Sequence, residues 1–419
     1  MKRLIAWLAM IALVICLVGC DLQKIAEFVD DNTHSDSAVL KPILVEWEGK
    51  DFEFDSHKNA IKRKDYYRYS NLSDEQQLLY DDIYNAVVNG VSVLDVKKHN
   101  INGGDVEEIY RAFLADNPQL FYLARTCKYV YSNEDRSVSE ILIMYSDGET
   151  TDDFDDSCKL VKSADRKIIA DKIKKLEEIV NKILNSIPEN AALIDKEKIV
   201  HDYIVATTDY NDSDISLYEN SETAPHIFDV YGALCENEAV CEGYAKAFQL
   251  LCNEIGINCI QAEGTGNSEQ HMWNSVYLDD WYYVDVTWDD DIDGGLPYYG
   301  YFNVSDSDFF KDHVTDTSYL SVPECEGEKY SYYNYYCAKV NSLKKSPVNY
   351  KKVADDISAG KLDYVIIYSD SLKLTDTYLR EHFLDADSDF MRYSISQGYN
   401  IALKWEYHTV GDYYYIPVE

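Results

Sequence analysis

The feature that most constrains the fold of this chain is a helix headed by a cysteine and followed by a pair of strands. After Cys241, apolar side chains recur at helical spacing through Tyr244 and Phe248, which predicts an amphipathic helix that begins at the cysteine. The runs 271–278 and 281–288 are rich in aromatic and β-branched residues and are separated by a short turn, so they predict a β-hairpin. A helix that buries one face beside such strands predicts a core of the α+β class.

Three side chains of this region can carry chemistry. Cys241 is expected in the first turn of its helix, where unpaired amide N–H groups and the helix dipole favour a thiolate. His271 and Asp285 belong to the two strands of the predicted hairpin and are expected side by side. A thiol beside an imidazole that is held by a carboxylate supplies the nucleophile, base and orienter of acyl transfer. The backbone N–H of Cys241 is the expected first donor of an oxyanion hole, and no spacing assigns the second.

A family resemblance rests on three sequence blocks that follow one another in the chain: Ala239-Val240-Cys241-Glu242-Gly243-Tyr244-Ala245, His271-Met272-Trp273-Asn274 and Val284-Asp285-Val286-Thr287-Trp288. Together they resemble the transglutaminase-like superfamily of papain-like thiol enzymes over roughly residues 195–315. The resemblance implies an α+β papain-like core in which Cys241 is the nucleophile, His271 the general base and Asp285 the orienter. It implies no cofactor and no metal ligand.

Other residues are weaker candidates for the site. His201, His226 and His313 lie in no comparable block, so none of them is expected to act as the base. Tyr210 lies where relatives often have an aromatic side chain near the pocket. The chain lacks the HExxH, GxSxG and GxxxxGK[ST] patterns, which leaves zinc protease, serine hydrolase and P-loop functions without support.

The acceptor of the acyl group decides which reaction the enzyme performs, and the sequence leaves two acceptors open. Water would make the protein a peptidase or amidase, and this outcome is slightly favoured because an exposed surface enzyme meets far more water than amine. A lysine amine would make it a cross-linking protein-glutamine gamma-glutamyltransferase. Surface proteins or wall peptides are the expected substrates. A third possibility, of another class, is a catalytically silent binding or assembly module of the cell envelope.

The N-terminus predicts export. Met1-Lys2-Arg3 supplies positive charge, Leu4 to Val18 form an apolar run too short to span a bilayer, and Gly19 precedes Cys20. This pattern resembles the bacterial lipoprotein lipobox, which implies cleavage after residue 19, lipid on Cys20 and an extracytoplasmic protein anchored to the cell membrane. A simple signal peptide with an incidental cysteine remains the alternative. Residues 20–65 carry mixed charges with weak periodicity and are expected to form a tether.

Beyond the tether, three regions are expected: a mainly helical region with a β-hairpin at 66–190, the catalytic core at 191–345 and a small α+β module at 346–419. A capping box at Ser73 to Gln76 marks the first helix. The expected helices are 73–90, 105–117, 169–187, 195–205 and 376–384, and the expected strands are 120–131, 138–145, 364–368, 401–408 and 413–418.

Net charge, cysteine spacing and one acidic run indicate which partners, metal sites and disulfides to expect. The chain has 75 acidic and 39 basic residues, a net charge of −36, so nucleic acid is not an expected partner. No CxxC motif occurs, which disfavours zinc ribbons, and Cys325 with Cys337 is the most plausible disulfide by spacing. Asp289, Asp291 and Asp293 resemble the start of a calcium loop, but the loop lacks its final glutamate and is expected to be a solvated acidic turn.

Overall fold

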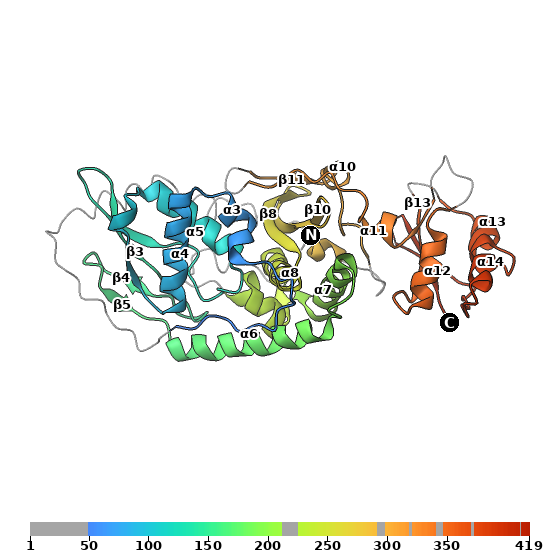
Figure 1. The fold of residues 1–419 in the computed structure, drawn as a ribbon, viewed down its shortest axis with the longest axis horizontal. Helices are drawn as coiled ribbons and strands as arrows, with labels where there is room; N and C mark the ends of the chain where they lie inside the picture. The colour runs from blue at the N-terminus through green and yellow to red at the C-terminus, as the bar shows by residue number, and fades with distance from the viewer. Residues whose placement is uncertain are drawn as a thin grey trace, which may run out of the picture. The chain divides into compact units, whose positions relative to one another are not determined.

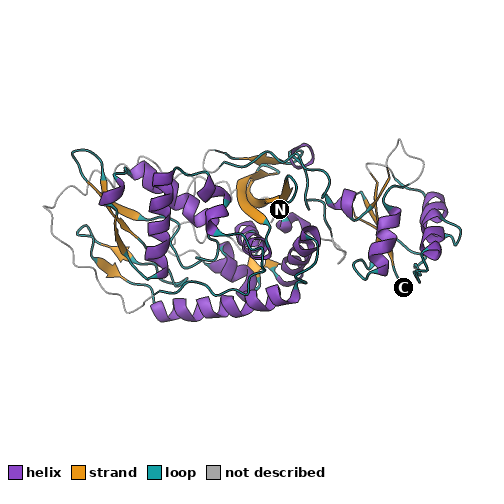
Figure 2. Ribbon diagram, in the orientation of Figure 1, coloured by secondary structure: helices purple, strands orange, loops and turns teal. Residues whose placement is uncertain are grey.

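The structure is a computed structural model that describes residues 49–211, 225–290, 298–317, 321–340, 347–369, 373–410 and 412–419. Unit 1 contains the described residues up to Leu278 with Asp285–Thr287 and Phe310–Pro323, and unit 2 contains Asp279–Val284, Trp288–Phe309 and Glu324–Glu419. Both units mix helices with strands (Figure 1, Figure 2), which confirms the α+β class. The three regions expected from the sequence stay predictions, since these units are divided differently.

No helix among the described residues is both long enough and apolar enough to cross a membrane. The run from Leu4 to Val18 and the cysteine at position 20 lie outside the described residues, so export and lipidation stay predictions. The predicted tether is wrong for residues 49–65. Lys50 pairs with Glu177 at 2.7 Å, and the N–H groups of His57 and Ile61 donate to backbone carbonyls of the helix that begins at Cys241. This segment therefore packs on the folded unit.

The first part of unit 1 combines short helices with two small sheets. Its helical segments are η1 (Arg63–Asp65), α3 (Tyr67–Ser70), α4 (Asp74–Val88), η2 (Lys97–His99) and α5 (Gly103–Asp116). One antiparallel sheet has the order β1 (Val93–Asp95), β3 (Val138–Leu142), β2 (Lys128–Tyr131), and β4 (Asp153–Phe154) pairs with β5 (Leu160–Lys162). The capping box of α4 is confirmed, because the Ser73 hydroxyl accepts from Gln76 N–H while the Gln76 side chain accepts from Ser73 N–H.

The expected strand at 120–131 is wrong in its first two thirds. After α5 the chain makes successive turns, with Leu120 N–H donating to Asn117 and Leu123 N–H donating to Leu120. The residues from 120 to 123 are apolar because these turns are buried, and the strand begins only at Lys128. Apolar content alone does not separate a buried turn from a buried strand.

The long helix α6 (Arg166–Ser186) confirms the expected helix at 169–187. Its apolar side chains at Ile169, Ile173, Leu176, Val180 and Ile183 are buried, as their spacing predicts. In Figure 1, α6 runs beneath both the α4 part and the α7–α8 part of unit 1. Helix α6 therefore extends along both parts of unit 1.

The remainder of unit 1 carries the candidate site. Its elements are α7 (Leu193–Thr207), β6 (Asp209–Tyr210), η4 (His226–Phe228), η5 (Gly232–Glu236), β7 (Glu238–Ala239), α8 (Cys241–Ile255), β8 (Asn258–Gly266), β9 (Glu269–Tyr277) and β11 (His313–Thr315), and the short helix α9 (Val286–Asp289) begins in unit 1 and ends in unit 2. Within unit 1, β9, β8 and β11 follow one another as antiparallel neighbours, and β6 pairs in parallel with β7. Helix α8 packs against β8, β9 and α7, and Gly256 ends it in a left-handed conformation.

Unit 2 contains β10 (Trp281–Val284) and a sheet of order β12 (Ala338–Val340), β13 (Tyr364–Ser369), β15 (Tyr413–Pro417), β14 (His408–Val410). Its helical segments are α10 (Asp306–Phe309), α11 (Tyr332–Tyr335), α12 (Tyr350–Ser358), α13 (Asp376–Leu379), η6 (Arg380–Leu384) and α14 (Asp389–Ser396). The expected strands at 364–368 and 413–418 and the expected helix at 376–384 are confirmed. The expected strand at 401–408 is wrong, because regular pairing begins only at His408. Helices α12 and α14 were not predicted.

Two further expectations fail. The second strand of the predicted hairpin ends at Val284 instead of Trp288, because the chain turns at Asp285 into the short helix α9. The disulfide between Cys325 and Cys337, the most plausible pair by spacing, is not formed, and both side chains are buried.

Candidate active site

Cys241 is the first residue of α8 and is half-buried. Val240 precedes it in an extended conformation and donates its N–H to the carbonyl of Ile227 at 2.9 Å, which fixes where the helix starts. A Cβ on Gly243 would meet the side chain of Ala239 and the carbonyl of Ile227, so only glycine permits this close approach. The thiol thus stands at a helix N-terminus, where backbone N–H groups favour an anion.

His271 lies in β9 opposite Gly264 of β8, and its side chain is nearly buried. Its Nε2 atom lies 2.6 Å from Oδ2 of Asp285, while the ring also hydrogen-bonds the Cys241 side chain. Because Asp285 occupies Nε2, Nδ1 is the ring nitrogen left for the thiol. The structure therefore brings together all three side chains that the sequence predicts as a site.

The charged forms of His271 and Asp285 stabilise each other. Burial alone would lower the pKa of His271, but the charge and hydrogen bond of Asp285, together with Cys241, raise it to about 10. Burial alone would raise the pKa of Asp285, but His271 and His313 lower it to about 2. At neutral pH the pair is therefore an imidazolium and a carboxylate, which is the charge state that supports a thiolate partner.

The sequence analysis named His313 only as a weak candidate for the base and did not predict its contact with Asp285. Its Nε2 atom lies 3.2 Å from Oδ2 of Asp285, and its Nδ1 atom lies 2.7 Å from Oδ1 of Asp312. No sequence signal marked it, because β11 is a strand of three residues that lies far along the chain from β9. The other two weak candidates belong to separate networks, since His201 contacts Asp202 and His226 contacts Asp229 and Lys172.

The same cluster has the donor types of a metal site. His271, Asp285 and His313 form the one group of three such side chains among the described residues whose ligand atoms lie within 4.8 Å of one another. However, the two imidazoles aim at a single carboxylate oxygen at 2.6 and 3.2 Å, which are hydrogen-bond separations. We therefore interpret the cluster as a hydrogen-bonded relay.

Glu242, the residue after Cys241, is neutralised by two cations. Arg125 and Lys246 each place a side-chain nitrogen 2.7 Å from its carboxylate. Burial tends to raise the pKa of Glu242, but these two cations hold it below its ordinary value. A carboxylate next to the thiol would otherwise oppose the thiolate, so this pairing removes most of that opposition.

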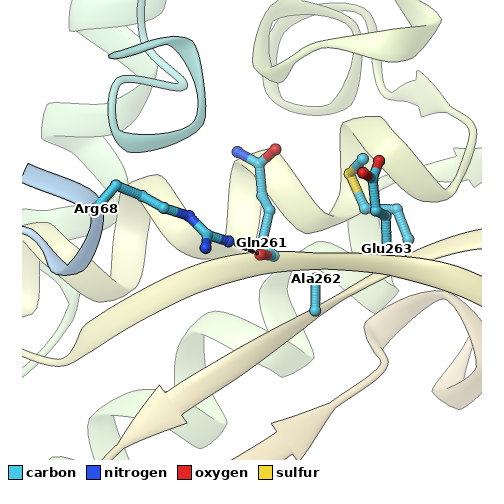
Figure 3. A pocket seen from close by; sticks show the side chains of 5 residues that line it. Arg68, Gln261, Ala262 and Glu263 are labelled. Carbon is cyan, nitrogen blue, oxygen red and sulfur yellow. Dashed lines mark hydrogen bonds between the residues drawn. The ribbon is translucent and has the colours of Figure 1, made fainter. Parts of the chain in front are cut away.

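Figure 3 shows a small pocket lined by Arg68, Gln261, Ala262, Glu263 and Met272. Gln261 and Glu263 point to one side of β8 and Ala262 to the other, as strand alternation requires. The Arg68 guanidinium reaches the strand and donates to the carbonyl of Gln261 at 2.8 Å. It donates a second bond to the carbonyl of Ser321, so its role is to tie backbone segments together.

The lining residues Glu263 and Met272 share one face of the sheet, and strand alternation turns the neighbouring His271 to the other face. Glu263 lies opposite Met272, which is the neighbour of His271 in β9. Burial raises the pKa of Glu263, and the carboxylates of Glu242 and Asp316 raise it further. The carboxylates of Glu242 and Glu263 are therefore close enough to act on each other.

The remaining expectations have mixed outcomes. Tyr210 pairs with Ala239, two residues before Cys241, so an aromatic side chain does lie close to the start of α8. The first-turn position of Cys241 leaves its backbone N–H outside the bonds of its own helix, which suits the expected oxyanion donor. Asp289 is buried and accepts from Tyr301 N–H at 2.9 Å, while Asp291 and Asp293 lie outside the described residues.

Residues 177–286 match the family model described as the Transglutaminase-like superfamily. The matched segment contains the three side chains of the candidate site. It extends from the second half of α6 to the first residue of α9.

Individual similarities are either short or low in identity. The curated proteins called Kyphoscoliosis peptidase from Mus musculus and from Homo sapiens are each 38% identical over 61 residues, which is 12% of this chain and 9% of theirs. A solved structure described as the crystal structure of a TGase is 15% identical with a TM-score of 0.25, over 59% of this chain and 57% of its own. The chain therefore spans only a small part of these curated relatives.

Proposed function

We propose, because residues 177–286 match the model of the transglutaminase-like superfamily, that the protein is a thiol enzyme that opens amide bonds through a thioester on Cys241. The observation that carries this proposal is the hydrogen-bonded series Cys241, His271 and Asp285 at the start of α8. Nucleophile, base and orienter are each within hydrogen-bond reach of the next.

In the proposed reaction, the Cys241 thiolate attacks the carbonyl carbon of the amide and forms a C–S bond. The carbonyl oxygen takes the negative charge and accepts from the Cys241 backbone N–H. His271 then gives its Nδ1 proton to the leaving nitrogen as the C–N bond breaks, which leaves a thioester and a free amine. Asp285 remains ionised throughout and stabilises the imidazolium.

The second half of the reaction is assigned to water. His271, now neutral, takes a proton from water, whose oxygen attacks the thioester and releases a carboxylic acid and the Cys241 thiolate. Hydrolysis is favoured because the thiol is only half-buried and thus open to water, and because the relatives named as peptidases support it. Attack by a lysine amine would instead give protein cross-linking.

The proposal extends to location and substrate. A lipid on Cys20 would hold the enzyme on the outer side of the cell membrane, where surface proteins and wall peptides carry amide bonds. Inhibition of lipoprotein signal peptidase should then leave a longer precursor in the membrane fraction. A Cys20→Ala variant that remains membrane-bound and is processed normally would contradict the anchor.

The test of the reaction uses the full chain in detergent, a mixture of peptides containing glutamine and lysine, and water enriched in oxygen-18. Mass spectrometry separates the outcomes, because hydrolysis places oxygen-18 in a new carboxylate, whereas transamidation with an added labelled amine removes ammonia and attaches the label. Cys241→Ala should abolish both reactions. Cys158→Ala is the matched control, since this half-buried thiol is free and lies in the loop before β5.

A silent binding module is the outcome of another class. It predicts that Cys241 reacts with iodoacetamide no faster than Cys158 at any pH from 5 to 9. It also predicts that no peptide is changed by the wild-type protein. Either fast, selective alkylation of Cys241 at pH 6 or turnover of one peptide excludes it.

A further inference from the structure

Asp285 is held from two sides. His271 from β9 and His313 from β11 both direct Nε2 at its Oδ2 atom, at 2.6 and 3.2 Å. The side chains of Asp285 and His313 are fully buried, and that of His271 is 8% exposed. The carboxylate that orients the imidazole base is thus itself fixed by a second imidazole.

The surroundings of His313 define its hydrogen bonds. Its Nε2 faces Asp285 and its Nδ1 faces Oδ1 of Asp312 at 2.7 Å, so each ring nitrogen faces a carboxylate oxygen. Ionised carboxylates only accept hydrogen bonds, and a neutral imidazole can donate from one nitrogen only. An Nε2–H of His313 that donates to Oδ2 stabilises the ionised form of the Asp285 carboxylate.

Packing holds this ring in place. His313 pairs with Gly266 in the ladder between β11 and β8, and Thr315 pairs with Gly264. The Trp273 ring meets the His313 ring edge to face with centroids 5.1 Å apart. A ring fixed by a strand register and an aromatic neighbour has a defined direction, which a surface histidine lacks.

We propose that His313 is a positioning residue for the reaction, which keeps the Asp285 carboxylate ionised and aimed at His271, with Asp312 holding the far side of the His313 ring. The site then comprises five side chains in series, from Cys241 to Asp312. This inference rests on the proposed function, because it assigns His313 a role in activating the same thiol.

The proposal predicts a change in pH dependence. The titratable groups that face His313 are Asp285, Asp312 and His271, and Asp285 in turn faces both imidazoles. Removal of His313 takes a hydrogen-bonding partner from Asp285 and with it one of the causes that lower the pKa of this carboxylate, so Asp285 should gain a proton at a higher pH than in the wild type. The pH below which Cys241 stops reacting quickly, called here its acid limit, should therefore rise as well. The reason is that a protonated Asp285 no longer stabilises the imidazolium of His271.

The experiment measures alkylation of Cys241 by iodoacetamide in the full chain between pH 3 and 9. We expect His313→Leu to react roughly tenfold more slowly at pH 7, by analogy with the loss of groups that orient metal ligands, and to show a raised acid limit. His313→Gln keeps an N–H donor near the position of Nε2, so its rate should lie between Leu and wild type. A His313→Leu protein with the wild-type rate and limit would overturn the proposal.

Control variants distinguish the proposed positioning role of His313 from a purely structural one. His201→Gln makes the same change at another buried histidine beside an aspartate and should alter neither the rate nor the acid limit. Circular dichroism shows whether His313→Leu folds. If it does not, the acid limit of His313→Gln tests the proposal: a raised limit supports the proposal, and an unchanged limit overturns it. Because alkylation needs no substrate, a wild-type protein that alkylates quickly but changes no peptide would contradict the proposed function alone.

Discussion

The Nε2 atom of His271 lies 2.6 Å from Oδ2 of the fully buried Asp285. This contact joins strand β9 to the residue at which the chain leaves β10 and turns into α9. A buried carboxylate is unfavourable unless cations or donors surround it, and here the imidazoles do so. The bond therefore fixes both the geometry of the base and its charge.

Replacement of the carboxylate should change the basicity of His271. Asp285 is the main cause that raises the pKa of His271 to about 10, so Asp285→Asn should make the imidazolium lose its proton at a lower pH. NMR of the imidazole protons between pH 5 and 11 measures this titration directly. Asp202→Asn, which removes the partner of His201 instead, is the matched control. An unchanged titration of His271 in Asp285→Asn would refute the assignment.

Stability should depend on pH through the same pair. The pKa of His271 is raised above its unfolded value of about 6.5, so its stabilisation is complete below that pH and disappears as the pH rises through about 10. The pKa of Asp285 is lowered, so its stabilisation is present above about pH 4 and disappears as the pH falls through about 2.

We therefore expect His271→Ala to be less stable than the wild type by about 3 kcal/mol at pH 6, since it leaves a buried charge with one partner fewer. The difference should shrink as the pH approaches 10. Urea unfolding at pH 6 and pH 10 provides the measurement. A deficit of the same size at both pH values would mean that packing, and not the ion pair, supplies the stabilisation.

The helix cap at Ser73 offers a prediction independent of the site. Ser73 and Gln76 satisfy each other's backbone N–H groups at the start of α4. Ser73→Ala should lower the free energy of unfolding by about 1 kcal/mol. Ser70→Ala removes a hydroxyl that bonds a carbonyl three residues back and leaves no helix N–H without its cap, so it should have less effect. Equal losses in the two variants would contradict a specific contribution from the capping box.

The parts of the fold that the sequence predicted are those set by local physical rules. The 3.6-residue periodicity fixed α6 and α8, and the capping box fixed the start of α4, because each signal lies within one element. The strand expected at 401–408 failed because strand formation depends on a partner elsewhere in the chain. Helix α14 was overlooked although Ser388 caps it, because its eight residues make only about two helical turns, too few for the period to be recognised.

The same division holds within the candidate site. Cys241, His271 and Asp285 could be predicted, since each sits in a sequence block with a recognisable local structure. His313 could not, because its role arises only when β11 adds to the sheet beside β8. Its closest sequence neighbour in the network, Asp312, looks like any surface aspartate in the sequence.

Gly264 permits that addition, and its replacement is a direct test of how much the site depends on β11. A Cβ on Gly264 would collide with the backbone carbonyl of Val314, so Gly264→Ala must push β11 away from β8. Overpacking of this kind costs about 1–3 kcal/mol of stability. Because His313 moves with β11, the variant should also alkylate Cys241 more slowly and show the raised acid limit expected of His313→Leu. Gly104→Ala in the first turn of α5, where the added Cβ would meet the Asn102 side-chain oxygen at 3.2 Å and no backbone atom of another element, is the control. If Gly264→Ala lost stability but kept the wild-type pH profile, the position of β11 would matter for folding and not for the thiol.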